Sequence, residues 1–313
     1  MMSEFKHISV LLDESVRLLD VKPDGVYADG TLGGGGHSSL ICSKLGENGM
    51  LIGIDRDTTA INAATKRLSE YRNKKEIVHS NYADIKDILR SLNVSGLDGA
   101  ILDLGVSSPQ LDTAERGFSY NMDARLDMRM NREDSLSAYE VVNEYSEAEL
   151  AKIIFDYGEE RFARQIARGI VNARQTKPVE TTFQLSDIIK SSIPAKARFA
   201  DKHPAKRTFQ AIRIEVNNEL GLLEGAIRDF VDVLKPGGVL SVITFHSLED
   251  RIVKQTFGQL ASGCECPKDF PICVCGKKPV VKILTRKPIV SGESELEMNI
   301  RAHSAKLRAV KKL

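Results

Sequence analysis

The sequence predicts an α/β fold, a doubly wound parallel sheet that a helical insertion interrupts. Up to about residue 104, apolar segments of strand length alternate with helix-like segments, which is the pattern of βαβ units. From about Gln110 to Leu220 the chain is polar and helical, without an apolar segment of comparable strength. Strand character returns at Val239–Phe245. We therefore expect one sheet domain whose sequence is divided into two parts.

The first part contains four expected strands, each a short apolar run bounded by turn residues. They are Gly25–Asp29, Met50–Asp55, Glu76–Ser80 and Leu97–Leu104. The helices expected between them are His37–Leu45, Thr58–Tyr71 and Ile85–Leu92. Near-continuous apolarity in the fourth segment is typical of a central strand that is buried on both faces.

The insertion is expected to consist of helices that prolines separate. They are Tyr139–Tyr157, Glu159–Arg174, Phe183–Ser192 and Thr208–Leu220. After the insertion we expect a helix, a turn, a strand, a helix and late β segments, at Leu222–Leu234, Lys235–Gly238, Val239–Phe245, Ser247–Leu260 and Val280–Ile289. The predicted domains are 1–112 and 221–313 for the two parts of the sheet domain, the second with a basic tail, and 113–220 for the insertion.

Composition places the chain among globular proteins. Hydrophobic residues make up 42% of the 313 residues and charged residues 28%, which differs from the composition of disordered chains. Lys and Arg number 44 against 43 Asp and Glu, so a nucleic-acid partner would have to bind to local basic patches. The chain shows neither a secretory signal at its start nor an apolar run near the ~18 residues of a membrane span. We expect a cytoplasmic enzyme.

A glycine-rich turn, Asp29-Gly-Thr-Leu-Gly-Gly-Gly-Gly-His37, follows the first strand. Glycines at this place let the backbone approach a ligand closely. Asp55 ends the second strand, where a carboxylate can accept hydrogen bonds from both hydroxyls of a bound ribose. Both features point to a cofactor, although a plain tight turn remains the alternative.

The spacing of this turn distinguishes three cofactor classes. A phosphate-binding loop would need Lys and then Ser or Thr after the last glycine, and a dinucleotide motif would need glycine where Ser38 stands. An acid four residues before Gly33-x-Gly35 fits S-adenosylmethionine instead. No diphosphate has to be held there, so Asp29 can face the sulfonium and amino-acid end of that cofactor.

The segment after the fourth strand carries polar groups that suit an amine. Ligands of open α/β sheets bind beyond the carboxyl ends of the strands, and Asp103 lies at this end. The amine of a base is a poor nucleophile because its lone pair is delocalised into the ring. The Ser108 hydroxyl and the carbonyl at or near Pro109 could accept its protons and favour a tetrahedral nitrogen. Alternatively, this Ser-Ser-Pro turn caps a helix.

Two features of the sequence limit the reactions that this turn can support. Amino-group methyltransferases carry a second proline and an aromatic residue here, where this chain has Gln110 and a leucine. Base stacking is therefore left to Phe118 or Tyr120. An enzyme that methylates cytosine C5 would need a cysteine thiolate to add to the ring, and no cysteine occurs between Cys42 and Cys264.

A series of motifs in the same order resembles the RsmH (MraW) family of bacterial methyltransferases. They are Asp29-Gly-Thr-Leu-Gly-Gly-Gly-Gly-His37-Ser38, Leu102-Asp-Leu-Gly-Val-Ser-Ser-Pro-Gln-Leu-Asp112, Glu115-Arg-Gly-Phe-Ser119, Leu126-Asp-Met-Arg129, Tyr157-Gly-Glu-Glu-Arg-Phe162, His203-Pro-Ala-Lys-Arg-Thr-Phe-Gln210 and Phe245-His-Ser-Leu-Glu-Asp-Arg251. The resemblance runs nearly from end to end. It implies a class I S-adenosylmethionine-dependent methyltransferase fold with an inserted, helical substrate-recognition domain.

The resemblance also implies a reaction and its site. Members methylate N4 of a decoding-centre cytosine in 16S ribosomal RNA. The implied contacts to S-adenosylmethionine are Gly35, Gly36, His37, Asp55, Tyr82, Asp103 and Gln110, and the Tyr82 ring would lie against adenine. The candidate catalytic residues are Asp103, Ser108 and Pro109.

Local charge favours an RNA partner. Basic residues gather in two places, at Lys196, Arg198, Lys202, Lys206, Arg207 and Arg213, and at Arg301, Lys306, Arg308, Lys311 and Lys312. Such clusters are often solvated faces, but beside a methyltransferase site they favour contacts to RNA phosphates. We expect 16S rRNA, within the 30S subunit, as partner. A homodimer is left open.

Cysteines and one histidine leave other possibilities open. Cys264, Cys266, Cys273 and Cys275 form two Cys-x-Cys pairs. These could bind zinc, stay reduced or form a reversible disulfide, so no metal ligand is assigned. His246 could accept a proton near the cofactor or could cap a helix.

Two other functions compete with rRNA methylation. A DNA amino-methyltransferase would share the chemistry of the turn after the fourth strand. An RNA-binding assembly factor could retain the cofactor pocket without catalysis, but Asp55, Asp103 and the Ser108–Pro109 turn together argue for methyl transfer.

Overall fold

The structure is a computed structural model that describes residues 9–198, 203–263, 266, 270–272 and 275–313, except the side chains of Ser108 and Ile300. The chain forms two compact units. The sheet unit consists of Met1–Gly105 and Leu220–Leu313, and the helical unit consists of Val106–Glu219. We expected the boundaries between the two units at 112/113 and 220/221. In the structure, the units divide at 105/106 and 219/220.

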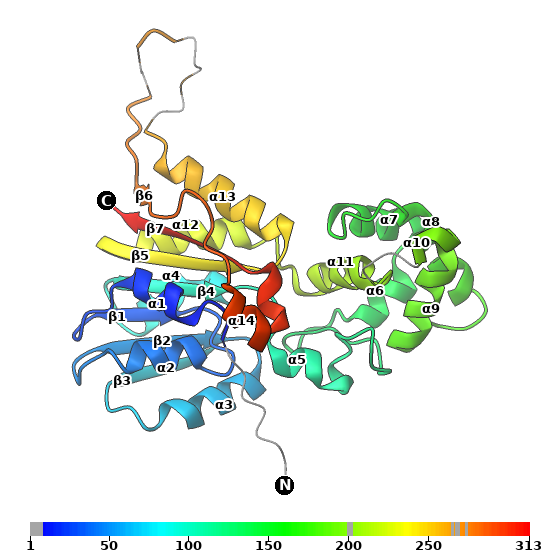
Figure 1. Ribbon diagram of the computed structural model, residues 1–313, viewed down its shortest axis with the longest axis horizontal. Helices are drawn as coiled ribbons and strands as arrows, with labels where there is room; N and C mark the ends of the chain where they lie inside the picture. Colours follow the sequence, from blue (N-terminus) through cyan, green and yellow to red (C-terminus); the bar gives the residue numbers. More distant parts are fainter. Residues whose placement is uncertain (1–8, 199–202, 264–265, 267–269, 273–274) are drawn as a thin grey trace. The chain divides into compact units, whose positions relative to one another are not determined.

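Seven strands form the sheet of the first unit (Figure 1). They are β1 (Val26–Asp29), β2 (Met50–Asp55), β3 (Lys74–His79), β4 (Leu97–Asp103), β5 (Leu234–Thr244), β6 (Val281–Ile283) and β7 (Lys306–Lys312). Their order is β3-β2-β1-β4-β5-β7-β6. The pairs from β3 to β5 are parallel, and β7 is antiparallel to both of its neighbours. The predicted parallel sheet with α/β alternation is confirmed.

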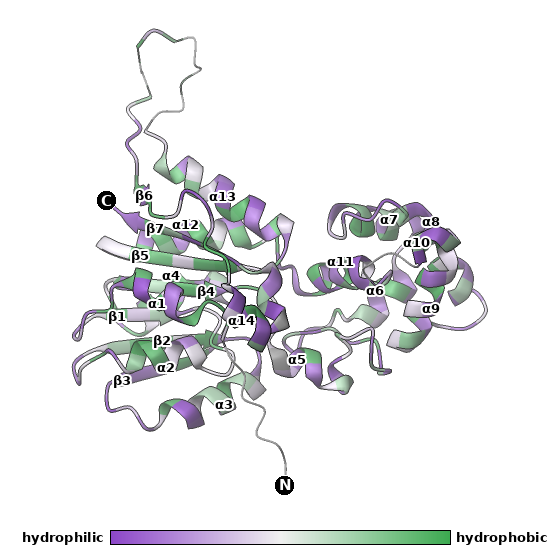
Figure 2. Cartoon of the chain, viewed as in Figure 1, coloured by the Kyte–Doolittle hydropathy of each residue, from purple (hydrophilic) through white to green (hydrophobic). Residues whose placement is uncertain are grey.

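Helices cover both faces of this sheet and produce two apolar cores. The first core unites the sheet with α4 (Ile85–Ser91), α12 (Leu223–Val233) and α13 (Ser247–Ala261). The second unites it with α1 (Leu12–Leu19), α2 (Gly36–Cys42) and α3 (Thr58–Leu68). Figure 2 shows hydrophobic residues along the central strands between these layers, as expected for strands buried on both faces.

The last strand corrects the interpretation of residues 306–312 as a basic tail. The segment pairs with β5 along its length and with β6. Arg308 is buried because its Nε and Nη2 donate to the Asp250 carboxylate at 2.6 and 3.2 Å, and Lys306 Nζ lies 3.3 Å from the same group. Two of the five basic residues assigned to the RNA therefore neutralise an acid of α13.

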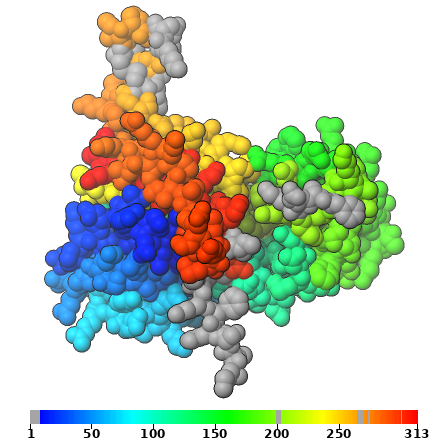
Figure 3. Space-filling model, viewed as in Figure 1, coloured from blue at the N-terminus to red at the C-terminus, as the bar shows by residue number. Residues whose placement is uncertain are grey.

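The N-terminal and C-terminal segments of the sheet unit lie side by side. Figure 3 shows them on one face, in blue and in orange to red. The Leu11 amide donates a hydrogen bond of 2.7 Å to Glu295 Oε1 in α14 (Glu293–Met298). Short 3₁₀ turns complete this unit at Tyr82–Asp84 and Ile300–Ser304.

The helical unit has its own apolar core. Its elements are α5 (Ser108–Asp112), a 3₁₀ turn (Ala114–Arg116), α6 (Ala138–Glu144), α7 (Glu147–Asp156), α8 (Ala163–Arg174), α9 (Thr182–Ser192), α10 (Ala195–Arg198) and α11 (Lys206–Asn217). The single helix expected at Tyr139–Tyr157 is wrong. Ser146 caps α7 by accepting from the Glu149 amide, while the Glu149 carboxylate accepts from the Ser146 amide. This capping box begins a new helix.

A long loop of the helical unit is held by one buried amide. Asn217, in the last turn of α11, donates to the Met128 carbonyl at 2.8 Å and accepts from the Met130 amide at 2.8 Å. Arg116 donates to the carbonyls of Arg129 and Met130. These bonds order the segment that carries the aromatic residues considered for base stacking. Among the described residues, no helix is long and apolar enough to span a bilayer.

Candidate active site

Three acids lie at the carboxyl ends of neighbouring strands in the sheet unit. Asp29 ends β1, Asp55 ends β2 and Asp103 ends β4. The chain runs outward from β1 to β3 in one direction and from β4 to β5 in the other. The ends of β1 and β4 therefore flank the point where the strand order reverses, which is where ligands of open α/β sheets bind.

The glycine-rich turn curves over these strand ends. Gly33 and Gly35 have φ angles of 49° and 74°, which glycine adopts without the cost that a Cβ would add. A Cβ at Gly35 would also come within 3.2 Å of Ala64 Cβ in α3, whereas a Cβ at Gly34 would meet nothing within 4 Å. The turn thus packs on α3 at one residue and faces open space at its neighbour.

Asp55 is tied to this turn. Its Oδ2 accepts from the Gly33 amide at 2.7 Å and its Oδ1 from the Asp57 amide at 2.8 Å. Each carboxylate oxygen keeps further acceptor capacity. Tyr82 lies near the start of the same turn, because a Cβ at Gly30 would come within 3.1 Å of Tyr82 Cβ. Of the predicted contacts, the structure therefore places Gly35, Asp55 and Tyr82 around one turn.

Asp103 and His37 form a second group at the end of β4. The Asp103 amide donates to Thr31 Oγ1 at 2.6 Å. His37, buried at the start of α2 next to Gly36, has Nδ1 at 3.7 Å from Asp103 Oδ2 and Nε2 at 3.2 Å from the Val10 carbonyl. Asp103 Oδ1 is buried and has no hydrogen-bond partner among the described residues.

Burial makes this group of acids costly to ionise. It raises the pKa of Asp29 to about 6, against the hydrogen bonds from Ser38 and Thr31. Burial also raises the pKa of Asp55, and it raises the pKa of Asp103 well above the ordinary value, with the charges of Asp29 and Glu249 adding to the effect. Among the described residues, neither Lys nor Arg forms an ion pair with Asp29, Asp55 or Asp103.

Such a group fits a cationic ligand. A buried carboxylate without a counter-ion is strongly destabilised, and Asp103 Oδ1 has unused acceptor capacity. S-adenosylmethionine carries a positively charged sulfonium, a ribose and an adenine. Asp29 and Asp103 offer acidic groups for the sulfonium. Asp55 offers hydrogen-bond acceptors for the ribose, and Tyr82 offers a ring for the adenine.

A family model decides between the cofactor classes. It is described as the MraW methylase family and matches residues 4–313. The chain belongs to this family. Curated relatives named "Ribosomal RNA small subunit methyltransferase H" are 57% identical over 309 residues in Brevibacillus brevis and 59% identical over 310 residues in Clostridium botulinum. Each match covers 99% of this chain, and it covers 98% and 100% of the respective relative.

A solved rRNA methylase from Streptococcus thermophilus is also similar, with a TM-score of 0.42 and 11% identity, covering 100% of this chain and 99% of that one. With membership of the family and the seven-stranded sheet, the predicted class I methyltransferase fold is confirmed. The predicted cofactor, S-adenosylmethionine, is confirmed with it. The individual contact residues stay predictions.

The turn after β4 opens the helical unit and is a helix cap. Ser107 is the N-cap of α5, and its hydroxyl accepts from the Gln110 amide at 3.4 Å while its amide donates to Gln110 Oε1 at 3.0 Å. The predicted cofactor contact of Gln110 thus competes with this capping role. The Pro109 carbonyl accepts from the Thr113 amide at 3.0 Å, which leaves one lone pair for an amine. The side chain of Ser108 lies outside the described residues.

The structure distinguishes the aromatic candidates of the helical unit. Phe118 is buried in the apolar core, so a base cannot stack on it without unpacking. Tyr120 is half-buried and stacks on His203, with ring centroids 4.4 Å apart and an interplanar angle of 9°. Phe209 of α11 meets Tyr120 edge-on at 5.7 Å. Tyr120 is therefore the better candidate for a contact with the target base.

One residue of the predicted basic patch in the helical unit is neutralised by an acid. Arg213 pairs with Glu219 through two bonds of 2.8 and 2.9 Å, and Arg207 donates to the Glu159 carbonyl at 2.8 Å. Arg198 likewise donates to the carbonyls of Ile193 and Ser191. Lys202 lies outside the described residues. Among the described residues, Lys196, Arg198, Lys206 and Arg207 form no ion pair with an acid, so these four side chains remain candidates for RNA phosphates.

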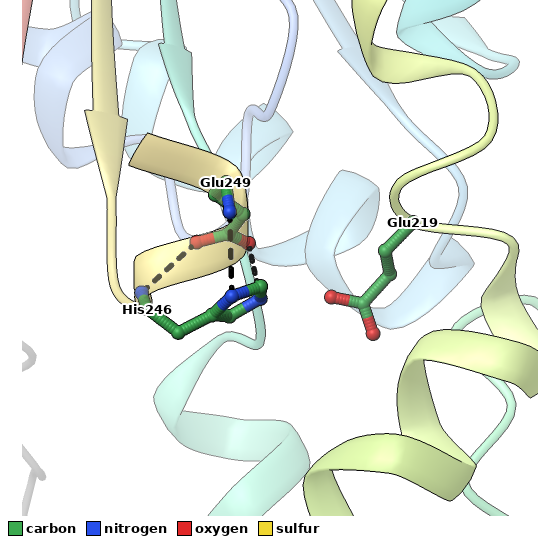
Figure 4. A group of neighbouring side chains, drawn as sticks. All are labelled: Glu219, His246 and Glu249. Atoms are coloured by element: carbon green, nitrogen blue, oxygen red, sulfur yellow. Dashed lines mark hydrogen bonds and ion pairs between the residues drawn. The ribbon is translucent and has the colours of Figure 1, made fainter. Parts of the chain in front are cut away.

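The structure shows what His246 does, but it does not test the zinc hypothesis for the cysteines. Figure 4 shows His246 at the start of α13, where its Nδ1 accepts from the Glu249 amide at 3.4 Å and its Nε2 lies 3.2 Å from Glu249 Oε1. Of the two possibilities stated for His246, the structure shows helix capping. Cys264 and Cys273 lie outside the described residues, so the zinc hypothesis stays a prediction.

Sequence reasoning missed two hydroxyl groups of the site. Thr31 accepts from the Asp103 amide, and Ser38 donates to Asp29 Oδ2 at 2.7 Å. Both belong to the glycine-rich motif that was singled out. Hydroxyl residues two positions after Asp29 and directly after His37 were the available signal.

Proposed function

We propose that this enzyme, which methylates small-subunit ribosomal RNA, modifies the N4 amino group of a decoding-centre cytosine in 16S rRNA. S-adenosylmethionine supplies the methyl group at its positively charged sulfur. The proposal includes the 30S subunit as the form of the substrate and the cytoplasm as its location. The names of the relatives support the rRNA substrate, and the end of β4 supports the choice of an amine.

The observation that carries the proposal is Asp103 at the end of β4, four residues before Ser107, where the Ser107–Gln110 turn begins. Methyl transfer to an amine is an in-line displacement in which positive charge develops on nitrogen, so the protein has to provide position and acceptor dipoles. Asp103 offers a buried carboxyl oxygen without a partner among the described residues. The Pro109 carbonyl and the Ser108 hydroxyl would supply the acceptors that orient the amine.

The cysteines argue against methylation of cytosine C5. That reaction needs a thiolate that adds to the ring. Cys42, in α2, is the cysteine of the sheet unit nearest in sequence to the glycine-rich turn, and it is packed in the apolar core. Burial raises the pKa of the Cys42 thiol, which disfavours the reactive thiolate.

The experiment that tests the proposal identifies the methylated atom. The protein is incubated with 30S subunits from a strain that lacks the modification and with isotopically labelled S-adenosylmethionine. Nucleoside mass spectrometry then distinguishes N4-methylcytidine from 5-methylcytidine, and fragment mapping locates the nucleotide. Label in 5-methylcytidine, or label outside the decoding centre, would refute the proposal. Duplex DNA in a parallel reaction tests the DNA alternative, and binding of 30S without label transfer would favour an assembly factor.

A further inference from the structure

The geometry of the His37–Asp103 pair favours one additional proton. His37 Nε2 lies 3.2 Å from the Val10 carbonyl, and a carbonyl only accepts hydrogen bonds. Nε2 therefore carries the ring proton. In the neutral ring, Nδ1 then directs a lone pair toward Asp103 Oδ2, 3.7 Å away. An ionised Asp103 and a neutral His37 would present two acceptors to each other, so one additional proton favours the pair.

The surroundings increase the demand for positive charge. The negative charges of Asp29 on β1 and Glu249 on α13 both act on Asp103. The Glu249 carboxylate also accepts hydrogen bonds from the Phe245 and His246 amides. Asp55 adds a third acid at the end of β2, and it acts on Asp29. His246 Nε2 lies 3.2 Å from Glu249 Oε1.

Arg67 is a basic residue of α3 that lies near the glycine-rich turn. Arg67 Nη1 would lie 3.7 Å from a Cβ at Gly36. Among the described residues, however, Arg67 forms no ion pair with the three strand-end acids. A proton or a cationic ligand would therefore stabilise the cluster.

We propose that the His37–Asp103 pair, within this acidic cluster, holds a proton at the place of the cofactor's positive charge, so that S-adenosylmethionine displaces a proton which its uncharged thioether product leaves in place. The proposal rests on the assignment of the cofactor site above. It makes Asp103 and His37 specificity-determining residues that distinguish the substrate cofactor from the spent one.

The charge difference between the two ligands explains the selectivity. Methyl transfer converts the sulfonium, which carries one positive charge, into a neutral thioether, S-adenosylhomocysteine. The amino-acid ends of the two ligands are the same. With the substrate bound, the acids can ionise beside a cation. With the product bound, the cluster loses the attraction of that cation and takes up a proton again, so the neutral thioether gains no binding energy from ionised acids and is released more readily.

The sign of the pH dependence follows from the raised pKa values of Asp29 and Asp103. Binding a cation stabilises the ionised acids and lowers their pKa. At a pH between the pKa of the free protein and the lower pKa of the complex, binding therefore releases protons. Affinity for S-adenosylmethionine therefore rises with pH. The rise is at most about tenfold per pH unit for each proton released.

The experiment measures binding by titration calorimetry, between pH 5.5 and 7.0, in buffers of different ionisation enthalpy. Three probes are compared: S-adenosylmethionine, S-adenosylhomocysteine and sinefungin, which carries an ammonium group in place of the methylsulfonium. We expect the affinity of both cationic ligands to rise about fivefold or more over this range, with proton release. The thioether should change less than about twofold. Equal pH slopes for all three ligands, or binding without proton release, would overturn the proposal.

Variants locate the effect. Asp103→Asn should reduce the pH slope for S-adenosylmethionine to the part that Asp29 contributes, and should bring its affinity closer to that of the thioether. Asp87→Asn, which changes an exposed acid of α4, should keep the wild-type slope. If Asp103→Asn does not fold, the three-ligand comparison on the wild-type protein still decides. Loss of the slope in Asp87→Asn as well would refute the assignment to the His37–Asp103 pair.

Failure of the cofactor-site assignment gives a different result. In that case Asp55→Ala binds S-adenosylmethionine with wild-type affinity, whatever the pH dependence. Failure of the charge proposal leaves Asp55→Ala weakened and the ligand slopes equal. The two outcomes are therefore distinguishable in the same instrument.

Discussion

Replacing Arg308 by alanine should destabilise the sheet unit without weakening its affinity for RNA. The side chains of Arg308 and Asp250 are 9% and 13% exposed and share two hydrogen bonds. Removing one partner of a buried ion pair leaves an uncompensated charge, which costs about 3–5 kcal/mol. Lys306 still lies 3.3 Å from the carboxylate, so we expect about 3 kcal/mol, the lower end of that range.

Lys306→Ala is the matched control on the same carboxylate. Its side chain is 41% exposed, and exposed ion pairs contribute about 0.2–1 kcal/mol. Urea unfolding followed by circular dichroism measures both variants, and filter binding to 30S subunits is carried out on the folded proteins. If Arg308→Ala keeps the wild-type midpoint and loses RNA affinity, the interpretation of β7 as a structural strand is wrong and the basic-tail hypothesis returns.

The same pair predicts a pH dependence. Burial by itself would raise the pKa of Asp250, but the hydrogen bonds and charges of Arg308 and Lys306 outweigh it and lower that pKa. The contribution of the pair to stability is then complete above the pKa of an unfolded Asp, about 3.9. It is lost as the pH falls through the lower folded value. The stability difference between wild type and Arg308→Ala should therefore be constant near neutral pH and shrink below about pH 4.

Three further predictions concern the reaction. Asp55→Ala should weaken S-adenosylmethionine binding by about 1.5–3 kcal/mol, or ten- to a hundredfold, by calorimetry; unchanged affinity would remove Asp55 from the site. Lys206→Glu should lower 30S affinity and the slope of its salt dependence, whereas Lys152→Glu on α7 should not; equal slopes would make Lys206 an ordinary solvated residue. Ser108→Ala should lower kcat more than it raises KM in single-turnover methylation, and a wild-type rate would mean that the serine only continues the capped turn.

The central part of the fold was predictable because its signals are local. The apolar runs that became β1, β2 and β4 alternate with helices in a pattern that few other folds share, and the glycine-rich turn lies where a parallel sheet binds ligands. Helix ends were less predictable. The break between α6 and α7 depends on a capping box at Ser146, three residues before Glu149, inside an otherwise continuous helical pattern.

What the sequence could not provide depends on residues far apart in the chain. Lys306–Lys312 is rich in positive charge, and its burial becomes possible only because Asp250, 58 residues before Arg308, neutralises that side chain. The pairing of His37 with Asp103 likewise joins α2 to β4. The composition and periodicity of a short segment cannot show either of these pairings. The acids were therefore predicted as separate contacts and not as one cluster.

The position of β7 has a consequence for the growing polypeptide. This strand is made after β5 and β6 but lies between them in the sheet. Until residues 306–312 have been added, which takes several seconds at roughly 5–20 residues per second, the outer edge of β5 has no partner strand. An open edge of this kind can recruit strands from other chains. A chain truncated before residue 306 would therefore keep this edge of β5 open and would be expected to aggregate.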